Sequence, residues 1–274
     1  MKHSSAEFAR IAENGTVLRC RVGSSVHGLA LEGRGDRDEM GICVEPPEYV
    51  IGLRVFEQYV FRARPGHVRS GPVGLDLTVY SLRKWVHLAL EGNPTVLLPL
   101  LVPEEEIVTA TGLGRELRAH RDRFLSRRTG QRFLDSLRAQ RERMEGTRHG
   151  KHTNRSELVE IHGFDTKYAY HMVRLGLQGV ELLETGGLTL PLPEPDRSWL
   201  RALHRGEHSR AEALDRTRTL EERLSGLCTT SPLPREPDSA WANRWLVGAY
   251  RRVWSEGGAP IPSGAGTSAN EPTM

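Results

Sequence analysis

The stretch that decides the fold is RVGSSVHGLALEGRGDRDEMGICV, residues 21–44. Gly23 and Ser24 follow the β-branched and apolar run TVLRCRV, which predicts a strand that ends in a tight turn. Twelve residues after Ser24, Asp36 and Asp38 stand one residue apart in a second predicted strand, DRDEMGICV. The pattern fits either a polar surface hairpin or a phosphate-binding turn beside a pair of metal ligands.

The spacing of the aspartates favours the metal ligands. Side chains alternate between the faces of a strand, so Asp36 and Asp38 point to the same side, about 6–7 Å apart along the strand. Converging carboxylates repel each other unless a cation lies between them, and Mg²⁺ prefers carboxylates together with phosphate oxygens and water. Asp76, in the predicted strand LDLTVYS (Leu75–Ser81), adds a third acid on the face opposite its apolar neighbours. All three meet at one sheet edge if the two strands are neighbours.

Three such acids suit nucleotidyl transfer. Two metal ions about 3.5–4 Å apart can clamp an in-line displacement at phosphorus. Asp36 and Asp38 would hold both ions, and Asp76 would complete the nucleophile side. Gly23 would let the backbone approach a triphosphate, and Ser24 would offer its hydroxyl and N–H near a helix start. Each part has a plainer interpretation: a lone D-x-D is most often a solvated turn, Gly-Ser often caps a helix, and Asp76 could pair with an arginine. The ordered set favours catalysis.

Length and composition describe an ordinary globular protein. The 274 residues, 38% hydrophobic and 27% charged with a net charge of +3, suit one large domain or two modest ones. No apolar run approaches the roughly 18 residues of a membrane span, and the N-terminus lacks a hydrophobic signal core, so we expect a cytoplasmic protein with no membrane partner. Cys20, Cys43 and Cys228 are too far apart to predict a disulfide framework or a zinc site.

The apolar period changes from strand-like to helical along the chain. The sequence predicts helices over Ser5–Glu13 and Ser25–Leu31, and another from Leu82 that ends at Gly92. Beyond residue 106 the predicted helical segments are 110–125, 130–145, 153–184, 196–204, 209–226 and 237–255. The expected fold class is α+β, a small mixed-sheet nucleotidyltransferase domain followed by a mainly helical domain. The expected domains are 1–105, 106–228, and a C-terminal helix with a disordered tail over 229–274.

Basic residues are concentrated in one segment. Residues 115–155 hold 13 Lys or Arg against 5 Asp or Glu. A segment of this kind can follow the phosphates of a nucleic acid, although a solvated helix in an Arg-rich protein has much the same composition.

A second polar surface is expected on the helix that Asp165 would cap. Lys167, His171, Arg174 and Gln178 follow at helical spacing and share one face. This face would suit a triphosphate or the leaving pyrophosphate, where negative charge accumulates. The plainer interpretation is a structural helix whose cations pair with acids elsewhere.

Other chemistries lack the required spacing. His149, His152 and His162 form no i, i+4 pair and have no neighbouring cysteine, which disfavours zinc, and no hydrolase triad is recognisable. The tryptophans occur at helical spacing and are expected to pack in the core or dock helices rather than stack on bases: Trp85, Trp241, Trp245 and Trp254.

At these motifs the chain resembles the DNA polymerase beta nucleotidyltransferase superfamily, and more narrowly a bacterial and phage family associated with RNA repair. The family's opening motif, GS, an aromatic–Gly pair and S-D-x-D-x-x-G, corresponds to Gly23-Ser24, His27-Gly28 and GDRDEMG. Later blocks correspond to LDLTVYSLRKWVHLALEGNPTVL, HGFDTKYAYHMVRLGLQG and LHRGEHSRAEAL. The resemblance covers residues 16–226.

The chain departs from the family pattern at His27, which replaces the aromatic residue, at Gly35, which replaces a serine, and at Leu98, where an acid is usual. The acid trio is intact. The resemblance implies transfer of an NMP from an NTP to an acceptor, with two Mg²⁺ ions and release of pyrophosphate. The implied metal ligands and catalytic residues are Asp36, Asp38 and Asp76, and the implied nucleotide-binding residues are Gly23, Ser24, Lys167, His171 and Arg174.

The preferred acceptor is an RNA end, because the basic segment could lie along a backbone. A protein hydroxyl, as in toxin-like relatives, and a catalytically inactive RNA-binding module remain as alternatives. A cationic small molecule is less favoured, because it would need an acidic pocket. The sequence does not specify the base of the NTP or the oligomeric state.

Overall fold

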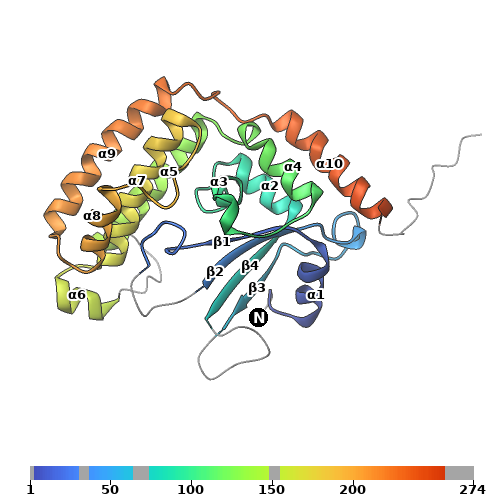
Figure 1. Cartoon of the computed structure of the whole chain (residues 1–274), viewed down its shortest axis with the longest axis horizontal. Coiled ribbons are helices and arrows are strands. Elements are labelled where there is room, and N and C mark those ends of the chain that lie inside the picture. The colour runs from blue at the N-terminus through green and yellow to red at the C-terminus, as the bar shows by residue number, and fades with distance from the viewer. Residues whose placement is uncertain (1–2, 31–36, 64–73, 148–154, 257–274) are drawn as a thin grey trace, which may run out of the picture.

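The structure, a computed structural model, describes residues 3–30, 37–63, 74–147 and 155–256. A five-stranded mixed sheet forms the first part of the chain and helices form most of the rest (Figure 1), which confirms the α+β class. The strands are β1 (Thr16–Val22), β2 (Arg37–Cys43), β3 (Gln58–Arg62), β4 (Leu75–Ser81) and β5 (Ile107–Ala110). The described helices are α1 (Ala6–Gly15), α2 (Leu82–Leu90), α3 (Leu98–Leu101), α4 (Gly112–Ala119), α5 (Arg127–Glu145), α6 (Ser156–His162), α7 (Thr166–Thr185), α8 (Asp196–His204), α9 (Arg210–Thr230) and α10 (Ser239–Glu256).

The strands lie in the order β3-β4-β2-β1-β5. The central pair, β2 and β4, is parallel, and the other three pairs are antiparallel. The second and third predicted strands are therefore neighbours, which is the condition that the acid trio required. The edge strands β3 and β5 were not predicted. Both are short and their residues are half-buried or exposed, so their sequences lack the clear alternation of apolar and polar residues that marks a strand.

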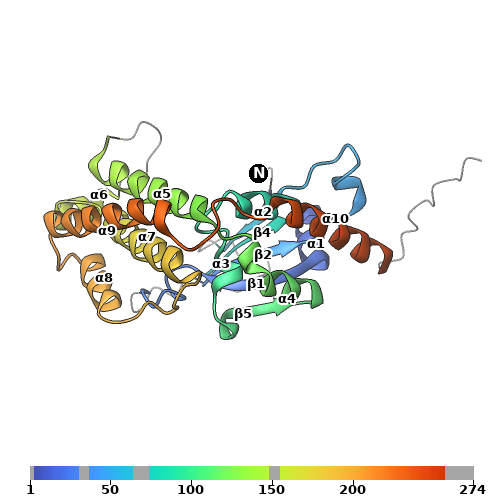
Figure 2. The same ribbon diagram turned by 90° about the horizontal axis from the view of Figure 1, so that it is seen from above.

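Helices cover both faces of the sheet (Figures 1 and 2). On one face, Ile11 of α1 packs in a cluster with Leu75, Leu77 and Val79 of β4. On the other face, β1 and β2 contribute to the main core beneath α2, α3 and α4. Because side chains alternate along β4, Asp76 lies on the second face.

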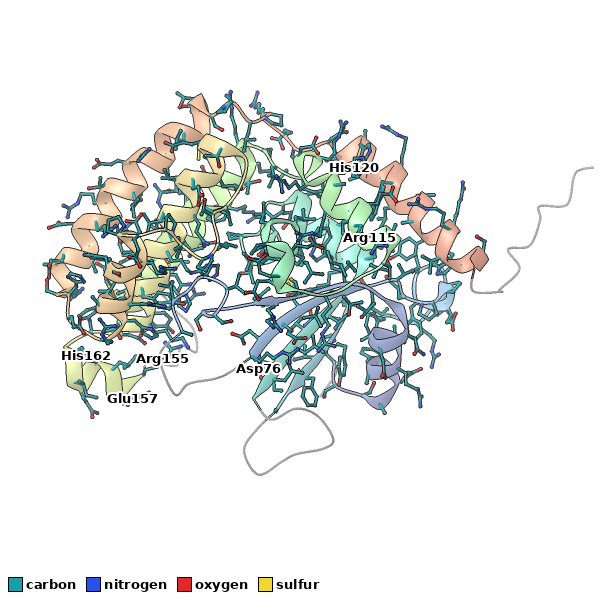
Figure 3. The ribbon with its side chains drawn as sticks, viewed as in Figure 1. Asp76, Arg115, His120, Arg155, Glu157 and His162 are labelled. Atoms are coloured by element: carbon teal, nitrogen blue, oxygen red, sulfur yellow. The ribbon has the colours of Figure 1, made fainter. Side chains whose placement is uncertain are left out.

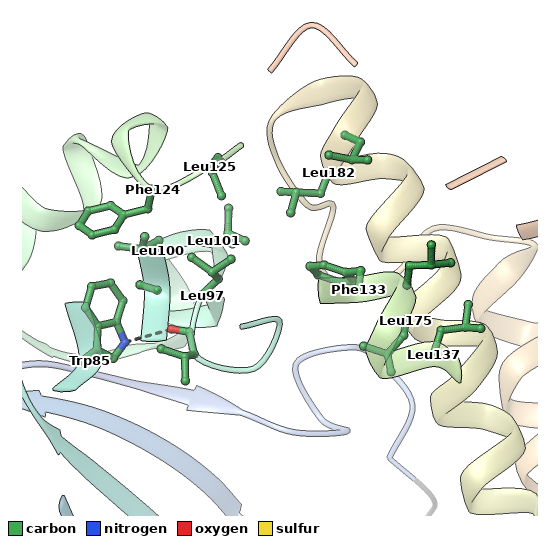
Figure 4. Close-up of a cluster of buried hydrophobic side chains, with 14 of the residues drawn as sticks. Trp85, Leu97, Leu100, Leu101, Phe124, Leu125, Phe133, Leu137, Leu175 and Leu182 are labelled. Atoms are coloured by element: carbon green, nitrogen blue, oxygen red, sulfur yellow. Dashed lines mark hydrogen bonds between the residues drawn. The ribbon is translucent and has the colours of Figure 1, made fainter. Parts of the chain in front are cut away.

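The core under α2 is built around Trp85 (Figure 4). Its indole Nε1 donates a hydrogen bond to the Val96 carbonyl at 3.0 Å, and its ring meets that of Phe124 edge to face, with centroids 5.5 Å apart. Helix α10 docks nearby, where Trp254 Nε1 donates to the Glu45 carbonyl at 3.1 Å. The prediction that the tryptophans pack in the core or dock helices is confirmed at these residues.

The helical part is centred on α7, which lies between α5 and α9. Two glycines of α7 allow the close approach. A Cβ on Gly176 would lie 2.9 Å from that of Leu220, and a Cβ on Gly179 would lie 2.9 Å from that of Phe133. No helix in the described ranges is long and apolar enough to cross a membrane.

Three helical predictions are corrected. The predicted segment 110–125 begins at the last residue of β5 and divides after Ala119, where α4 ends and a 3₁₀ turn (Arg121–Arg123) follows. Residues 24–28 form successive turns where the sequence predicts the start of a helix over 25–31, with Gly28 at φ +71°. Leu31 lies outside the described residues. The predicted segment 153–184 is divided at Gly163, whose φ of +78° ends α6. Asp165 then caps α7 by accepting hydrogen bonds from the backbone N–H groups of residues 167 and 168 at 3.0 and 3.1 Å, as predicted.

The expected boundary at residue 105 falls inside the sheet-forming part of the chain, because β5 pairs with β1 and α4 then packs against β1. The sheet therefore continues to Ala110. The division into three domains otherwise stays a prediction, and the expected disordered tail after residue 256 lies outside the described residues.

Candidate active site

Two of the three predicted acids stand side by side at one edge of the sheet. In the parallel pair of β2 and β4, Asp38 lies directly opposite Asp76. Neighbouring strands are about 4.8 Å apart, so both carboxylates leave the same face at nearly the same place. Asp38 is half-buried and Asp76 is exposed. Figure 3 shows Asp76 at the end of the sheet that faces the helical part, across from Arg155.

The third predicted acid, Asp36, lies outside the described residues. In the described part of the chain no group of three His, Cys, Asp or Glu residues could hold a metal ion. Two adjacent carboxylates are nevertheless the hard oxygen ligands that Mg²⁺ prefers, and their mutual repulsion favours a cation between them. Although Arg62 lies opposite Asp76 in the antiparallel β3–β4 pair, no ion pair of Asp76 with it occurs among the described residues. The residues present therefore fit a divalent cation.

The turn after β1 is held against the carboxylate of Asp38. Gly23 has φ +81°, and a Cβ at this position would lie 2.1 Å from Asp38 Oδ2. Only glycine has both the backbone freedom and the space for this approach. The predicted proximity of the Gly-Ser turn to the acids is thus present, although no helix begins there.

The turn itself is compact. The N–H of Leu29 donates to the Ser24 carbonyl at 2.8 Å, and that of Gly28 donates to the Ser25 carbonyl at 2.9 Å. A Cβ on Gly28 would lie 2.8 Å from Arg197 Cδ of α8, so the turn also packs against the helical part. Ser24 is half-buried beside Gly23, at the start of this turn.

His27, at the centre of the turn, connects it to α7. The side chain is 2% exposed. Its Nε2 lies 2.9 Å from Arg174 Nη1, and its Nδ1 lies 3.1 Å from Gln178 Nε2. The N–H of Leu192 also donates to the His27 carbonyl at 3.2 Å. Burial, followed by the charges of Arg174 and His171, lowers the pKa of His27 well below its ordinary value, so the imidazole is neutral near pH 7.

The predicted polar face of α7 carries a concentration of positive groups. Lys167, His171 and Arg174 are each half-buried. Burial is the main cause that lowers the pKa of His171 well below its ordinary value, with further lowering by Arg174, Lys167, Arg155 and His204. His171 is therefore neutral near pH 7 in the free protein, which corrects the cationic role expected from the sequence. An anion bound beside His171 would raise its pKa again.

Tyr170 of α7 lies near Asp38. Burial raises the pKa of Tyr170, the charge of Arg174 lowers it, and the charge of Asp38 raises it further. Asp38 is therefore close enough to α7 for its charge to act there. The ring of Tyr170 stacks on that of His204 with centroids 4.8 Å apart. The acid pair, the Gly23 turn and the basic face of α7 thus border one region.

A family model described as "RNA repair pathway DNA polymerase beta family" (RlaP) matches residues 1–247. The chain belongs to the RlaP family. Among solved structures, the nucleotidyltransferase-like protein from Exiguobacterium sibiricum is similar over 90% of this chain and 78% of its own, with 12% sequence identity and a TM-score of 0.30. No curated protein matches. Membership in the RlaP family confirms the resemblance inferred from the motifs and supports a nucleotidyltransferase linked to RNA repair.

In this RlaP family member the basic segment 115–155 has an internal structural role. Most of its described arginines bind carboxylates or carbonyl groups of the same chain. The contacts are Arg118 with the Pro99 and Val102 carbonyls, Arg123 with Asp238, Arg127 with the Thr229, Ser231 and Leu233 carbonyls, Arg128 with Glu236, Arg132 with Glu91, Arg138 and Arg141 with Glu221, and Arg155 with Asp165. An RNA backbone on these helices would have to compete with these partners.

Sequence reasoning missed three participants of the site. It treated His27 as a departure from a motif, although the structure makes it the contact between the turn and α7. No sequence pattern marks Tyr170 or His204 as site residues, because their position near Asp38 and His171 depends on how α7 and α8 pack. Of the three histidines considered for zinc, His149 and His152 lie outside the described residues. His162 packs against Gly206, where a Cβ would lie 2.1 Å from Nδ1.

Proposed function

We propose that this protein is a Mg²⁺-dependent nucleotidyltransferase that transfers an NMP from an NTP to an RNA end and releases pyrophosphate. The observation that carries the proposal is the register that puts Asp38 opposite Asp76, with Gly23 against the Asp38 carboxylate. RlaP family membership supports the reaction class and the link to RNA.

Each acid has a distinct role in this proposal. Two Mg²⁺ ions bound by Asp36, Asp38 and Asp76 would supply positive charge at the α-phosphate and lower the pKa of the acceptor hydroxyl. The role of Asp36 is inferred from its spacing to Asp38 in the sequence. Asp76 is the more exposed member of the described pair, so it faces the side from which an acceptor arrives.

The transfer step is an in-line displacement. The acceptor hydroxyl oxygen forms a bond to the α-phosphorus as the bond from that phosphorus to the bridging oxygen of the β-phosphate breaks. The hydroxyl proton passes to Asp76 and then to water, and the electron pair leaves with pyrophosphate. Gly23 and Ser24 line the triphosphate on the sheet side. Lys167, His171 and Arg174 stabilise the charge that develops on the leaving group.

The proposal also names the acceptor of the NMP. An RNA end is favoured by the family. A protein hydroxyl is the second candidate, because intramolecular partners occupy most of the described arginines that would otherwise bind an RNA backbone. In both cases the chemistry at phosphorus is the same.

The test is transfer of α-³²P label from each of the four NTPs, with Mg²⁺, into a mixture of tRNA, total RNA and cell protein. Asp38→Asn and Asp76→Asn remove one metal-binding charge each and are expected to lower transfer by at least about 10³-fold, because each carboxylate would stabilise charge in the transition state. Asp215→Asn, at an exposed carboxylate of α9 with a side chain 70% exposed, is the matched control and should leave transfer unchanged.

Label in an RNA band that is lost in both site variants would support the proposal, and the productive NTP would identify the base. Label in a protein band would keep the chemistry and replace the acceptor. RNA binding without label from any NTP would overturn the enzymatic function in favour of a binding module.

A further inference from the structure

His27, Arg174 and Gln178 form a closed triangle of polar contacts between the Gly-Ser turn and α7. Arg174 Nη1 lies 2.9 Å from His27 Nε2 and 2.8 Å from Gln178 Oε1, and Gln178 Nε2 lies 3.1 Å from His27 Nδ1. His27 and Gln178 are each 2% exposed. We refer to these three side chains as the His27 triangle.

The His27 triangle has one hydrogen-bond acceptor too few. The guanidinium of Arg174 can only donate, so His27 Nε2 and Gln178 Oε1 must both accept from it. A neutral imidazole then carries its proton on Nδ1, and this N–H faces the NH₂ group of Gln178. Turning the amide over satisfies His27 but brings the NH₂ group against the guanidinium. Every choice of ring tautomer and amide orientation leaves at least one contact between two donors.

Arg174 is also a half-buried cation with an enclosed Nε and, among the described residues, no carboxylate partner. Within the described ranges it forms no ion pair, and its Nε has no hydrogen-bond partner. Burial lowers the pKa of Arg174, and only Tyr170 opposes that effect. A buried guanidinium normally has a carboxylate or phosphate, because loss of its hydration is otherwise uncompensated. A bound anion would supply the acceptor that the enclosed Nε of Arg174 lacks.

We propose that the His27 triangle holds Arg174 in an incompletely hydrogen-bonded position, from which the triphosphate of an NTP draws the guanidinium away from Gln178. His27 is thus a positioning residue for nucleotide binding, and Gln178 is the side chain that Arg174 leaves when the nucleotide binds. When phosphate oxygens accept from Arg174, the Gln178 amide turns and its Oε1 accepts from His27 Nδ1–H. All three side chains are then satisfied, and the turn that carries Gly23 and Ser24 stays attached to α7. The inference rests on the proposed function and adds how this site recognises a triphosphate.

The decisive variant is Gln178→Glu. A carboxylate at this position offers acceptors to both Arg174 and His27 Nδ1–H, so it completes the His27 triangle without a ligand. The free protein is expected to melt about 2–4 °C higher than wild type, as a modest gain in stability would give for a chain of this size. Binding of α,β-methylene NTPs, which keep the triphosphate but resist cleavage at the α-phosphorus, is expected to weaken by at least about 10-fold. In the transfer assay KM should rise with kcat changed less than about threefold.

Two further variants separate this inference from a general effect of charge. Asn243→Asp adds the same charge on the exposed surface of α10 and should change neither melting nor binding. Gln178→Met removes the amide donor and acceptor but keeps the volume, and it should bind the analogues within about threefold of wild type or more tightly.

The outcomes distinguish the inference from the proposed function. A wild-type protein that binds none of the four analogues would overturn the proposed function and this inference with it. If wild type binds an analogue, the inference alone is overturned by a Gln178→Glu protein that binds equally well or melts no higher. It is also overturned by a Gln178→Met protein that loses more than about 10-fold in affinity, because Gln178 would then hold Arg174 in its binding position.

Discussion

At the scale of single residues, the closest approach in the site is between Gly23 and the carboxylate of Asp38. Gly23→Ala would put a Cβ where Asp38 Oδ2 now lies, 2.1 Å away, on a backbone at φ +81°. The carboxylate that we propose as a Mg²⁺ ligand would have to move, so transfer is expected to fall by at least about 10²-fold. Stability should fall by about 1–2 kcal/mol from the left-handed backbone alone. Steady-state kinetics and thermal melting measure the two effects separately.

Gly146→Ala is the matched control, because Gly146 has φ +73° at the end of α5 and no atom within 4 Å of its added Cβ. It should lose similar stability and keep its activity. Equal activity of the two variants would contradict the role assigned to the close approach at Gly23.

The lowered pKa of His171 predicts how stability and nucleotide binding depend on pH. Its pKa lies well below 6.5 because of burial and the neighbouring Arg174, Lys167, Arg155 and His204. Between that lowered pKa and 6.5, the unfolded chain binds more protons at this residue than the folded protein does. The free energy of unfolding therefore falls as pH drops below about 6.5. A bound triphosphate would raise the pKa again, so binding should take up a proton and strengthen as pH falls through the same range.

Calorimetry of NTP analogue binding in two buffers of different ionisation enthalpy measures the proton uptake. His171→Gln should abolish it and should reduce the dependence of melting temperature on pH below 6.5 to the share that His27 contributes. Proton uptake that persists unchanged in His171→Gln would assign the effect to another group.

At the scale of elements, the helical part depends on glycines in α7 that allow α5 and α9 to approach. An added Cβ on Gly176 would lie 2.9 Å from Leu220 Cβ and 3.1 Å from Leu137 Cδ1. Gly176→Ala should therefore cost about 1–3 kcal/mol of stability through overpacking, although alanine is the better helix former. Urea unfolding gives the difference.

Gly226→Ala in α9 has open space for its Cβ and should stabilise the protein by up to about 1 kcal/mol. The packing therefore predicts that Gly176→Ala lowers the free energy of unfolding and that Gly226→Ala raises it. If both stabilise the protein, α7 and α9 are less closely packed than the structure shows.

At the scale of the whole molecule, α10 returns from the helical part to the sheet. The hydroxyl of Tyr250 accepts from the Arg83 N–H at the start of α2, at 3.0 Å. It also lies near the buried carboxyl of Glu45, whose pKa is raised by burial and lowered in part by Tyr250. Tyr250→Phe would leave the Arg83 N–H without this acceptor, so it should lower the free energy of unfolding by about 1–3 kcal/mol. Val247→Ala removes a side chain that is 44% exposed on the same helix and should cost less than about 0.5 kcal/mol. Chemical denaturation of the two variants compares them, and equal losses would indicate that the Tyr250 contacts do not hold α10 in place.

The sequence by itself predicted β1, β2 and β4, because turn residues bound each segment and because β1 and β4 are rich in β-branched and apolar residues. It also predicted the cap at Asp165, since a short polar side chain directly before a helical segment accepts hydrogen bonds from the first free N–H groups of the helix. The acid motif and the blocks that follow it were sufficient to predict the family. These features depend on residues close together along the chain.

Only the tertiary structure decided which distant residues share the site. The parallel pairing that puts Asp38 opposite Asp76, and the contact of His27 with Arg174, join segments that no local pattern relates. The same holds for the basic segment: its composition suggested RNA contacts, whereas the folded chain supplies carboxylates and carbonyl groups to most of its described arginines. Local preference acts over a few residues, but the partner of a long charged side chain depends on how the helices pack against each other and against the sheet.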